Sequence, residues 1–220
     1  MGKFIIQCCV AIFAIMASGA TILAQDQPPR VGAMREFRPM MPRVEAPDLA
    51  FVDAEGKERK LSEFRGRLVL LNLWATWCAP CVKEMPSLER LQAKRGGDRF
   101  LVLALSQDRG GLFQVRQFYD AQDLKGLDIF VDKTMASARA LKAAALPTTL
   151  LIDPEGREIG RLVGAAEWDS PEAIAYIDFY LRGVVAPGSG PGAAPPASSS
   201  TQASLDRRLI ADIVAGSARP

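Results

Sequence analysis

Between residues 47 and 183, short continuous apolar runs alternate with stretches whose apolar residues recur at helical spacing. The run from Leu68 to Trp74 is apolar at every position except Asn72, which is typical of a strand buried in a parallel sheet. This order of elements predicts an α/β domain with a central mixed sheet flanked by helices and extra strands at its N-terminal side. The predicted strands cover residues 49–53, 58–61, 68–74, 100–105, 128–131, 146–153 and 157–163, and the helices cover about 79–94, 112–121, 135–141 and the stretch from Ser170 onward.

The two ends of the chain have a different composition from this domain. Residues 1–24 combine an early lysine with an apolar run, so they predict either a cleaved signal peptide or a membrane anchor over residues 4–24. Either alternative predicts that the domain is exported. We expect a periplasmic location, with the domain either free or anchored to the inner membrane by residues 4–24. Residues 184–220 begin as a low-complexity tail rich in Ala, Gly, Pro and Ser, and they end in a possible short helix.

Residues 25–46 are polar and proline-rich, which predicts a linker between the export segment and the domain. Met34, Met40 and Met41 lie in this segment. Thioethers are soft ligands that suit Cu(I), so a copper-binding role is one interpretation of the three methionines. The other interpretation is that they are unrelated residues of a loosely packed arm.

The overall charge excludes one broad class of function. The formal net charge is only +2, with 27 basic and 25 acidic residues, and no stretch combines clustered basic residues with aromatic ones. Proteins that bind nucleic acids usually carry such a basic footprint. We therefore expect no nucleic-acid partner.

The strand at 68–74 leads into the turn Cys78-Ala79-Pro80-Cys81, where the next helix begins. Cys78 would then lie at a helix N-terminus, where free N–H groups and the helix dipole lower a thiol pKa below its usual value of about 8.5. Pro80 suits the first turn of a helix because it needs no N–H partner there. This arrangement predicts a redox-active disulfide between Cys78 and Cys81.

Two structural alternatives for this cysteine pair are weak. A zinc site needs four ligands, but the chain has no histidine, and its other two cysteines lie within the first nine residues. A purely structural disulfide across two residues would close a very small loop and would constrain the unfolded chain little. We therefore expect no metal, and thiol–disulfide chemistry requires no cofactor.

Three motifs resemble the thioredoxin superfamily, and in particular its TlpA/ResA branch. They are Trp74–Cys81, Lys83–Pro86 and Leu146–Thr149. The resemblance covers about residues 47–183 and implies a thioredoxin-like fold and a thiol–disulfide oxidoreductase. It also implies that Pro147 follows a cis peptide bond and faces the dithiol, and that substrate contacts come from Trp77, Ala79, Pro80, Leu146 and Pro147.

Glu84 lies one helical turn after Cys81, on the same face of the predicted helix. The resembled branch uses an acid at this position to tune the thiols, and a nearby carboxylate would raise a cysteine pKa. The alternative is a glutamate on the solvated face of the helix. Asn72 stands where thioredoxin carries an aspartate, and an amide cannot act as a base.

In the resembled branch, the implied reaction is reduction of specific client proteins by a Cys78 nucleophile and a Cys81 resolver. Implied clients are proteins of cytochrome c or cytochrome oxidase copper-site assembly, and the implied electron donor is a membrane thiol carrier. A general disulfide oxidase and a copper-binding chaperone that uses the Cys-x-x-Cys pair are the alternatives. A peroxidase is disfavoured because the Pro and Thr expected before a peroxidatic cysteine are not both present.

Overall fold

The computed structural model describes residues 27–184, which form one eight-stranded sheet covered by helices. The strand order across the sheet is β1-β8-β7-β4-β5-β6-β2-β3. The strands are β1 (Arg38–Glu45), β2 (Ala50–Val52), β3 (Glu58–Lys60), β4 (Leu68–Trp74), β5 (Phe100–Ser106), β6 (Phe130–Val131), β7 (Thr148–Ile152) and β8 (Arg157–Val163). The helices are α2 (Ala79–Arg95), α3 (Gly111–Gln122), α4 (Ala136–Ala140) and α5 (Pro171–Leu181), with 3-10 turns η2 (Gly32–Glu36) and η3 (Leu61–Phe64).

Strand β4 occupies the middle of the sheet, and all seven of its residues are buried. It pairs in parallel with β5 and antiparallel with β7, so the predicted mixed sheet is confirmed. Strand β6 is shorter than predicted, because only Leu105 and Ser106 of β5 have partners in it. Because β4 and β5 run parallel, the Cys-x-x-Cys turn that follows β4 lies at the end of the sheet where β5 also ends.

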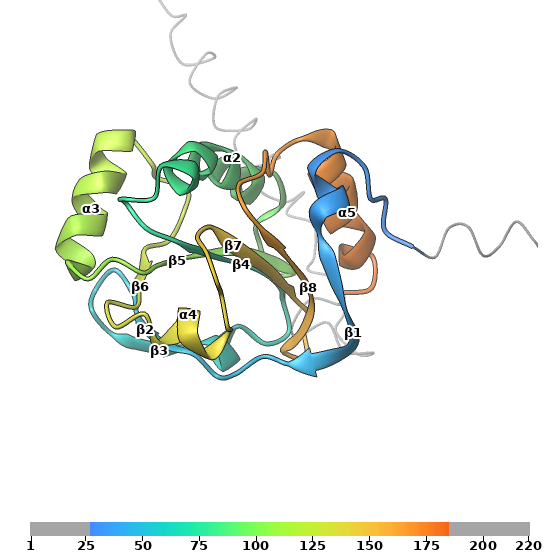
Figure 1. Ribbon diagram of the computed structural model, residues 1–220, viewed down its shortest axis with the longest axis horizontal. Helices are drawn as coiled ribbons and strands as arrows, with labels where there is room; N and C mark the ends of the chain where they lie inside the picture. The colour runs from blue at the N-terminus through green and yellow to red at the C-terminus, as the bar shows by residue number, and fades with distance from the viewer. Residues whose placement is uncertain (1–26, 185–220) are drawn as a thin grey trace, which may run out of the picture. The chain divides into compact units, whose positions relative to one another are not determined.

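Helices α2 and α5 cover one face of the sheet, and α4 lies on the other (Figure 1). One hydrophobic cluster joins α2, α3 and α5, and a second cluster joins α4 to η3. Helix α5 begins as its sequence predicts: Ser170 is the N-cap, and its hydroxyl accepts a hydrogen bond from the Ala173 N–H at 3.2 Å. Pro171 occupies the first helical position.

The predicted linker at residues 25–46 is wrong for most of its length. Residues 32–45 form η2 and β1, and β1 pairs antiparallel with β8 as the last strand of the sheet. Met34 and Phe37 are each only 1 % exposed, and the Phe37 ring lies 4.8 Å from the ring of Tyr176 on α5. These two apolar side chains pack η2 against α5, an arrangement that the proline-rich composition of the segment concealed.

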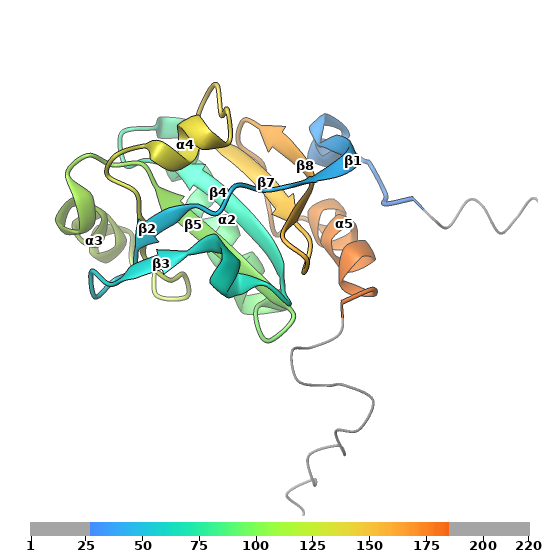
Figure 2. The same cartoon turned by 90° about the horizontal axis from the view of Figure 1, so that it is seen from below.

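After β1 the chain crosses the sheet and joins β2 toward the opposite edge (Figure 2). Leu49, in this crossing, is buried in the cluster on the α4 face. Strands β2 and β3 form the extra hairpin that the alternation of residues 49–61 predicted.

The predicted export segment (residues 1–24), most of the predicted tail (residues 184–220) and Cys8 and Cys9 lie outside the described residues. Between residues 27 and 184, no helix is long and apolar enough to cross a membrane.

Candidate functional site

A disulfide between Cys78 and Cys81 lies at the junction of β4 and α2, and their Cα atoms are 5.2 Å apart. Cys78 is the N-cap of α2, and its Sγ accepts a hydrogen bond from the Cys81 N–H at 3.3 Å. Cys78 is 6 % exposed, whereas Cys81 is fully buried. The first cysteine is therefore the one that a partner can reach, and it lies where a helix N-terminus stabilises negative charge.

The Leu146–Pro147 peptide bond is cis, as the resemblance implied. Trp77, Ala79, Pro80 and Leu146 line one groove together with Cys78. Pro147, the next residue after Leu146, is buried and does not line this groove. The structure thus brings four of the five residues assigned to substrate contact into one surface next to the disulfide.

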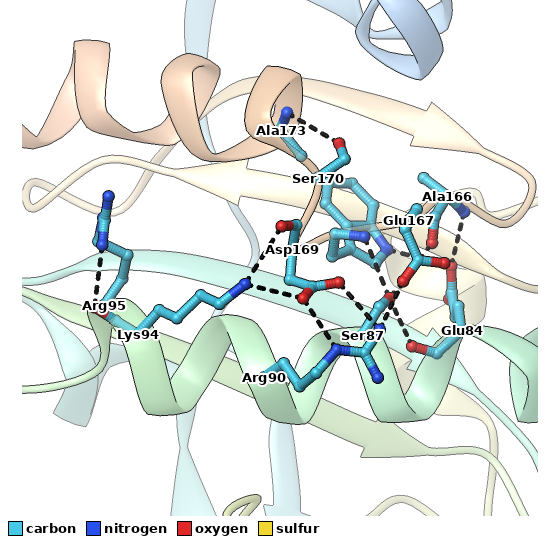
Figure 3. Close-up of polar contacts among 11 residues, drawn as sticks. Glu84, Ser87, Arg90, Lys94, Arg95, Ala166, Glu167, Asp169, Ser170 and Ala173 are labelled. Carbon is cyan, nitrogen blue, oxygen red and sulfur yellow. Dashed lines mark hydrogen bonds and ion pairs between the residues drawn. The ribbon is translucent and has the colours of Figure 1, made fainter.

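Glu84 is buried, with only 2 % of its surface exposed, so the solvated-helix alternative is wrong. One carboxylate oxygen accepts a hydrogen bond from the Asn72 amide at 2.7 Å. The other accepts from the Ala166 N–H and from the Trp168 indole N–H, each at 3.0 Å. Figure 3 shows the segment from Ala166 to Asp169 lying along α2, with Ala166 pointing at Glu84.

Burial raises the pKa of the Glu84 carboxyl from 4.5 to about 7, because the charged form loses its hydration. The hydrogen bonds from Ala166, Asn72 and Trp168 favour the charged form and act in the opposite direction. No cation is paired with Glu84 among the described residues. The site therefore contains a buried carboxyl that can hold or release a proton near neutral pH, one helical turn from Cys81.

Asn72 holds Glu84 in place from the middle of the sheet. Its side-chain nitrogen donates both to Glu84 and, at 2.9 Å, to the Thr149 hydroxyl on β7. Asn72, Thr149 and Trp168 are all buried. The sequence interrupted an apolar strand with Asn72, which signalled a special role, but nothing in it pointed to Thr149 or Trp168 as partners of Glu84.

Asp108 is a second buried acid near the dithiol, and no role was predicted for it from the sequence. Its carboxylate accepts hydrogen bonds from the Thr76 N–H at 2.9 Å and the Thr76 hydroxyl at 2.7 Å, and also from the Ser106 hydroxyl and the Gln114 amide. Asp108 is fully buried and follows β5 by two residues. It therefore fixes the backbone two residues before Cys78. The only signal in the sequence was a polar run directly after a buried strand.

The structure weakens the copper interpretation of the methionines. Met34 is a core residue, and Met40 and Met41 lie on β1, which is separated from β4 by two strands. In the part of the chain that the structure describes, no group of three His, Cys, Asp or Glu side chains is placed to hold a metal ion. The three methionines and the dithiol do not form one ligand set.

Residues 42–157 match the model of the AhpC/TSA family. The chain is 35 % identical over 120 residues to a thiol-disulfide oxidoreductase ResA of Bacillus cereus, an alignment that covers 54 % of this chain and 68 % of that protein. It is 38 % identical over 114 residues to the thioredoxin-like protein YneN of Bacillus subtilis, covering 51 % of this chain and 65 % of YneN.

A solved structure from Chlorobium tepidum, described as a thiol:disulfide interchange protein DsbE, has the same fold with a TM-score of 0.57 and 29 % identity. The match covers 63 % of this chain and 96 % of that one. A thiol-disulfide oxidoreductase from Bacteroides vulgatus matches with a TM-score of 0.54 and 26 % identity, over 65 % of this chain and 96 % of that one.

Proposed function

This chain belongs to the AhpC/TSA family and is a thioredoxin-like thiol–disulfide oxidoreductase of the ResA type, and on that premise we propose that it reduces the disulfides of specific client proteins. Cys78 is the nucleophile and Cys81 the resolving cysteine. One observation carries this proposal: the disulfide caps the N-terminus of α2, with the buried carboxyl of Glu84 one turn further along the same helix.

The reaction begins with the protein in its dithiol form. The Cys78 thiolate attacks one sulfur of the client disulfide, so that a Cys78–client disulfide forms and the other client sulfur leaves as a thiolate. Cys81 then attacks Cys78, which re-forms the Cys78–Cys81 disulfide and releases the second client thiol. The client gains two electrons and two protons, and the protein becomes oxidised by the same amount.

The helix N-terminus supports the first step, because its N–H groups and dipole stabilise the Cys78 thiolate. The contact from the Cys81 N–H to the Cys78 sulfur in the oxidised protein lies along this helix start. Cys81 is fully buried and lies one turn further in, so it is placed to attack Cys78 and not an external disulfide.

Glu84 supports the second step. Cys81 must lose its proton before it can resolve the mixed disulfide, and a carboxyl with a pKa of about 7 can accept a proton at neutral pH. The carboxyl is held by hydrogen bonds from three sides, so its position relative to α2 is fixed. We assign Glu84 two roles. It accepts the proton of Cys81, and its negative charge raises the thiol pKa and so limits stabilisation of the Cys78 thiolate.

The protein must be re-reduced after each turnover, and we assign that role to a membrane thiol carrier on the outer side of the inner membrane. The likeness to ResA supports clients in cytochrome c or cytochrome oxidase copper-site assembly, and a periplasmic location either as a free protein or anchored by residues 4–24.

Capture on a Cys81→Ser variant tests this function. The reduced variant should form a stable mixed disulfide with a disulfide-containing protein, because the resolving thiol of Cys81 is absent. Mass spectrometry of the captured adduct should place the bond at Cys78. Failure to capture any disulfide-containing protein, while wild-type protein also leaves protein disulfides intact, would refute the proposed function.

A further inference from the structure

Residues 166–169, which connect β8 to α5, lie along α2 (Figure 3). We call them the Trp168 segment. The residues of α2 that form hydrogen bonds or ion pairs with it are Glu84, Ser87, Arg90 and Lys94. Their spacing places them on one face of the helix. The segment is therefore attached to α2 along the face that carries Glu84.

Ion pairs fix the C-terminal end of the segment. Arg90 donates to both carboxylate oxygens of Asp169, at 2.8 and 2.9 Å, and Lys94 Nζ lies 2.9 Å from one of them. Two N–H donors on one carboxylate form a directional contact. This contact fixes the orientation of the backbone next to Trp168.

Trp168 is buried, with only 1 % of its surface exposed. Its backbone N–H donates to the Ser87 hydroxyl at 3.0 Å, and its indole N–H donates to Oε2 of Glu84, also at 3.0 Å. The Ala166 N–H donates to the same oxygen at 3.0 Å. The segment thus brings two N–H groups onto one oxygen of Glu84.

These two contacts determine which oxygen of Glu84 can carry a proton. An indole N–H and a backbone N–H are donors only, so a proton on Oε2 would face no acceptor. The neutral carboxyl must therefore carry its proton on Oε1, which lies 2.7 Å from the Asn72 amide nitrogen. The Oδ1 atom of the same amide is a buried acceptor without a hydrogen-bond partner in the described part of the chain, and a half-turn of the amide presents it to Oε1.

Hydrogen bonds from uncharged groups favour the charged form of Glu84, and burial acts against it. Asn72 donates from β4, and the Trp168 segment donates twice. The acidic residues of the segment, at 167 and 169, are both paired with Arg90. On α2 itself, Cys81 lies one turn before Glu84, and Lys83 is exposed. Loss of one of the three donors should therefore raise the pH at which Glu84 ionises.

We infer that Trp168 is a positioning residue for resolution of the mixed disulfide. Its indole N–H keeps Oε2 of Glu84 between two donors, so that Oε1 is the atom that receives the proton of Cys81. The ion pairs of Asp169 hold Trp168 in this contact. This role rests on the proposed function of Glu84 and adds the residue that keeps its carboxyl available as a base.

One proton moves in this step. It passes from the Cys81 sulfur to Oε1 of Glu84, and the Cys81 thiolate then attacks Cys78. The client sulfur leaves as a thiolate and takes a proton from water. When the protein is re-reduced, Cys81 leaves Cys78 as a thiolate and recovers the proton from Oε1.

The variant Trp168→Phe tests this role, because it keeps an aromatic ring and removes the N–H donor. Reduced full-length protein is mixed with saturating glutathione disulfide, and mass spectrometry of the acid-quenched peptide with Cys78 and Cys81 follows resolution of the mixed disulfide. For wild type, the resolution rate should rise with pH around a midpoint near 7. In Trp168→Phe the midpoint should move up by about one pH unit, so that resolution is about fivefold slower at pH 7 and unchanged at about pH 9.

Two aspartates that pair with α2 provide matched variants. Asp169→Ala removes the ion pairs of the segment and should raise the midpoint by less than Trp168→Phe, because both N–H donors remain. Asp178→Ala removes the comparable pair between α5 and Arg95, at 2.7 and 2.9 Å, and should leave the midpoint unchanged. In a Glu84→Gln background, Trp168→Phe should not shift the pH profile at all, since the residue through which it acts is gone.

An unchanged midpoint in Trp168→Phe, with slower resolution at every pH, would make Trp168 a packing residue and overturn the inference. If this variant does not fold, an unchanged midpoint in Asp169→Ala has the same consequence. Exchange by wild type would in both cases leave the reductase function intact. No exchange by wild type would overturn the reductase function, and this role with it.

Discussion

Replacement of Cys78 by serine is expected to abolish disulfide exchange completely. Cys78 lines the groove beside the Cys-x-x-Cys turn, and it is the N-cap residue of α2. The remaining Cys81 is fully buried, so an external disulfide cannot approach it in line. The rate of exchange with glutathione disulfide in single-turnover experiments should fall from that of the reduced wild-type protein to the buffer background.

The Cys81→Ser variant is the matched control, because it loses the same disulfide and the same number of thiols. It should keep the first attack at a rate within a fewfold of wild type and stop at the mixed disulfide. A Cys78→Ser variant that still attacks external disulfides, or a Cys81→Ser variant that does not, would reverse the two roles.

Replacement of Glu84 by glutamine should remove a pH dependence of stability worth about 3 kcal/mol. The pKa of Glu84 is about 7 in the folded protein and 4.5 ordinarily, so the folded state holds this proton more tightly than the unfolded chain does. The stabilisation is complete below pH 4.5, declines as the unfolded chain ionises, and is lost once the pH passes about 7. Urea unfolding of oxidised wild type and variant across this range gives the difference.

The diagnostic quantity is the slope of the unfolding free energy against pH. The absolute stability is not diagnostic, because an amide beside the Ala166 and Trp168 donors destabilises the folded state by about 1–3 kcal/mol at every pH. Glu55→Gln is the control: Glu55 is exposed, and its removal should change stability by less than about 0.5 kcal/mol throughout. Parallel stability curves for wild type and Glu84→Gln would show that the pKa of Glu84 is the same in the folded and unfolded states, which would contradict this prediction.

The central part of the fold was predictable because its signals are local. A continuous apolar run, a Cys-x-x-Cys turn with proline and an amphipathic stretch specify β4, the turn and α2 within residues 68–95. The N-cap serine and following proline did the same for α5. In these segments, local preference and tertiary environment agree.

The environment of Glu84 was not predictable, because it depends on contacts between distant parts of the chain. Helical spacing placed Glu84 on the face of Cys81, but its hydrogen-bond partners Ala166 and Trp168 follow 82 and 84 residues later. The same limit applies to η2 and β1. Phe37 is buried against Tyr176 of α5, and no periodicity in a short proline-rich segment reveals that partner.

The groove lies between these two cases. The cysteine turn and the Leu146–Pro147 pair were recognisable as motifs that the fold would bring together. Met135, Ala138 and the alanines at 143–145 also line this groove. Met135 and Ala138 were predicted only as part of a short helix, and no role was predicted for the alanines. Small residues leave little trace in a hydrophobic pattern, yet they determine how much room lies beside Cys78.

The reduction potential of the Cys78–Cys81 couple tests the central claim, reduction of client disulfides, most directly. The helix N-terminus stabilises the Cys78 thiolate, which by itself favours the dithiol form and would make the protein an oxidant. The buried carboxyl of Glu84 disfavours the thiolate and shifts the couple in the opposite direction. Equilibration of the full-length protein with glutathione buffers should give a potential near that of thioredoxin, about −270 mV. A potential near that of the oxidase DsbA, about −120 mV, would contradict the account and make the protein a donor of disulfides.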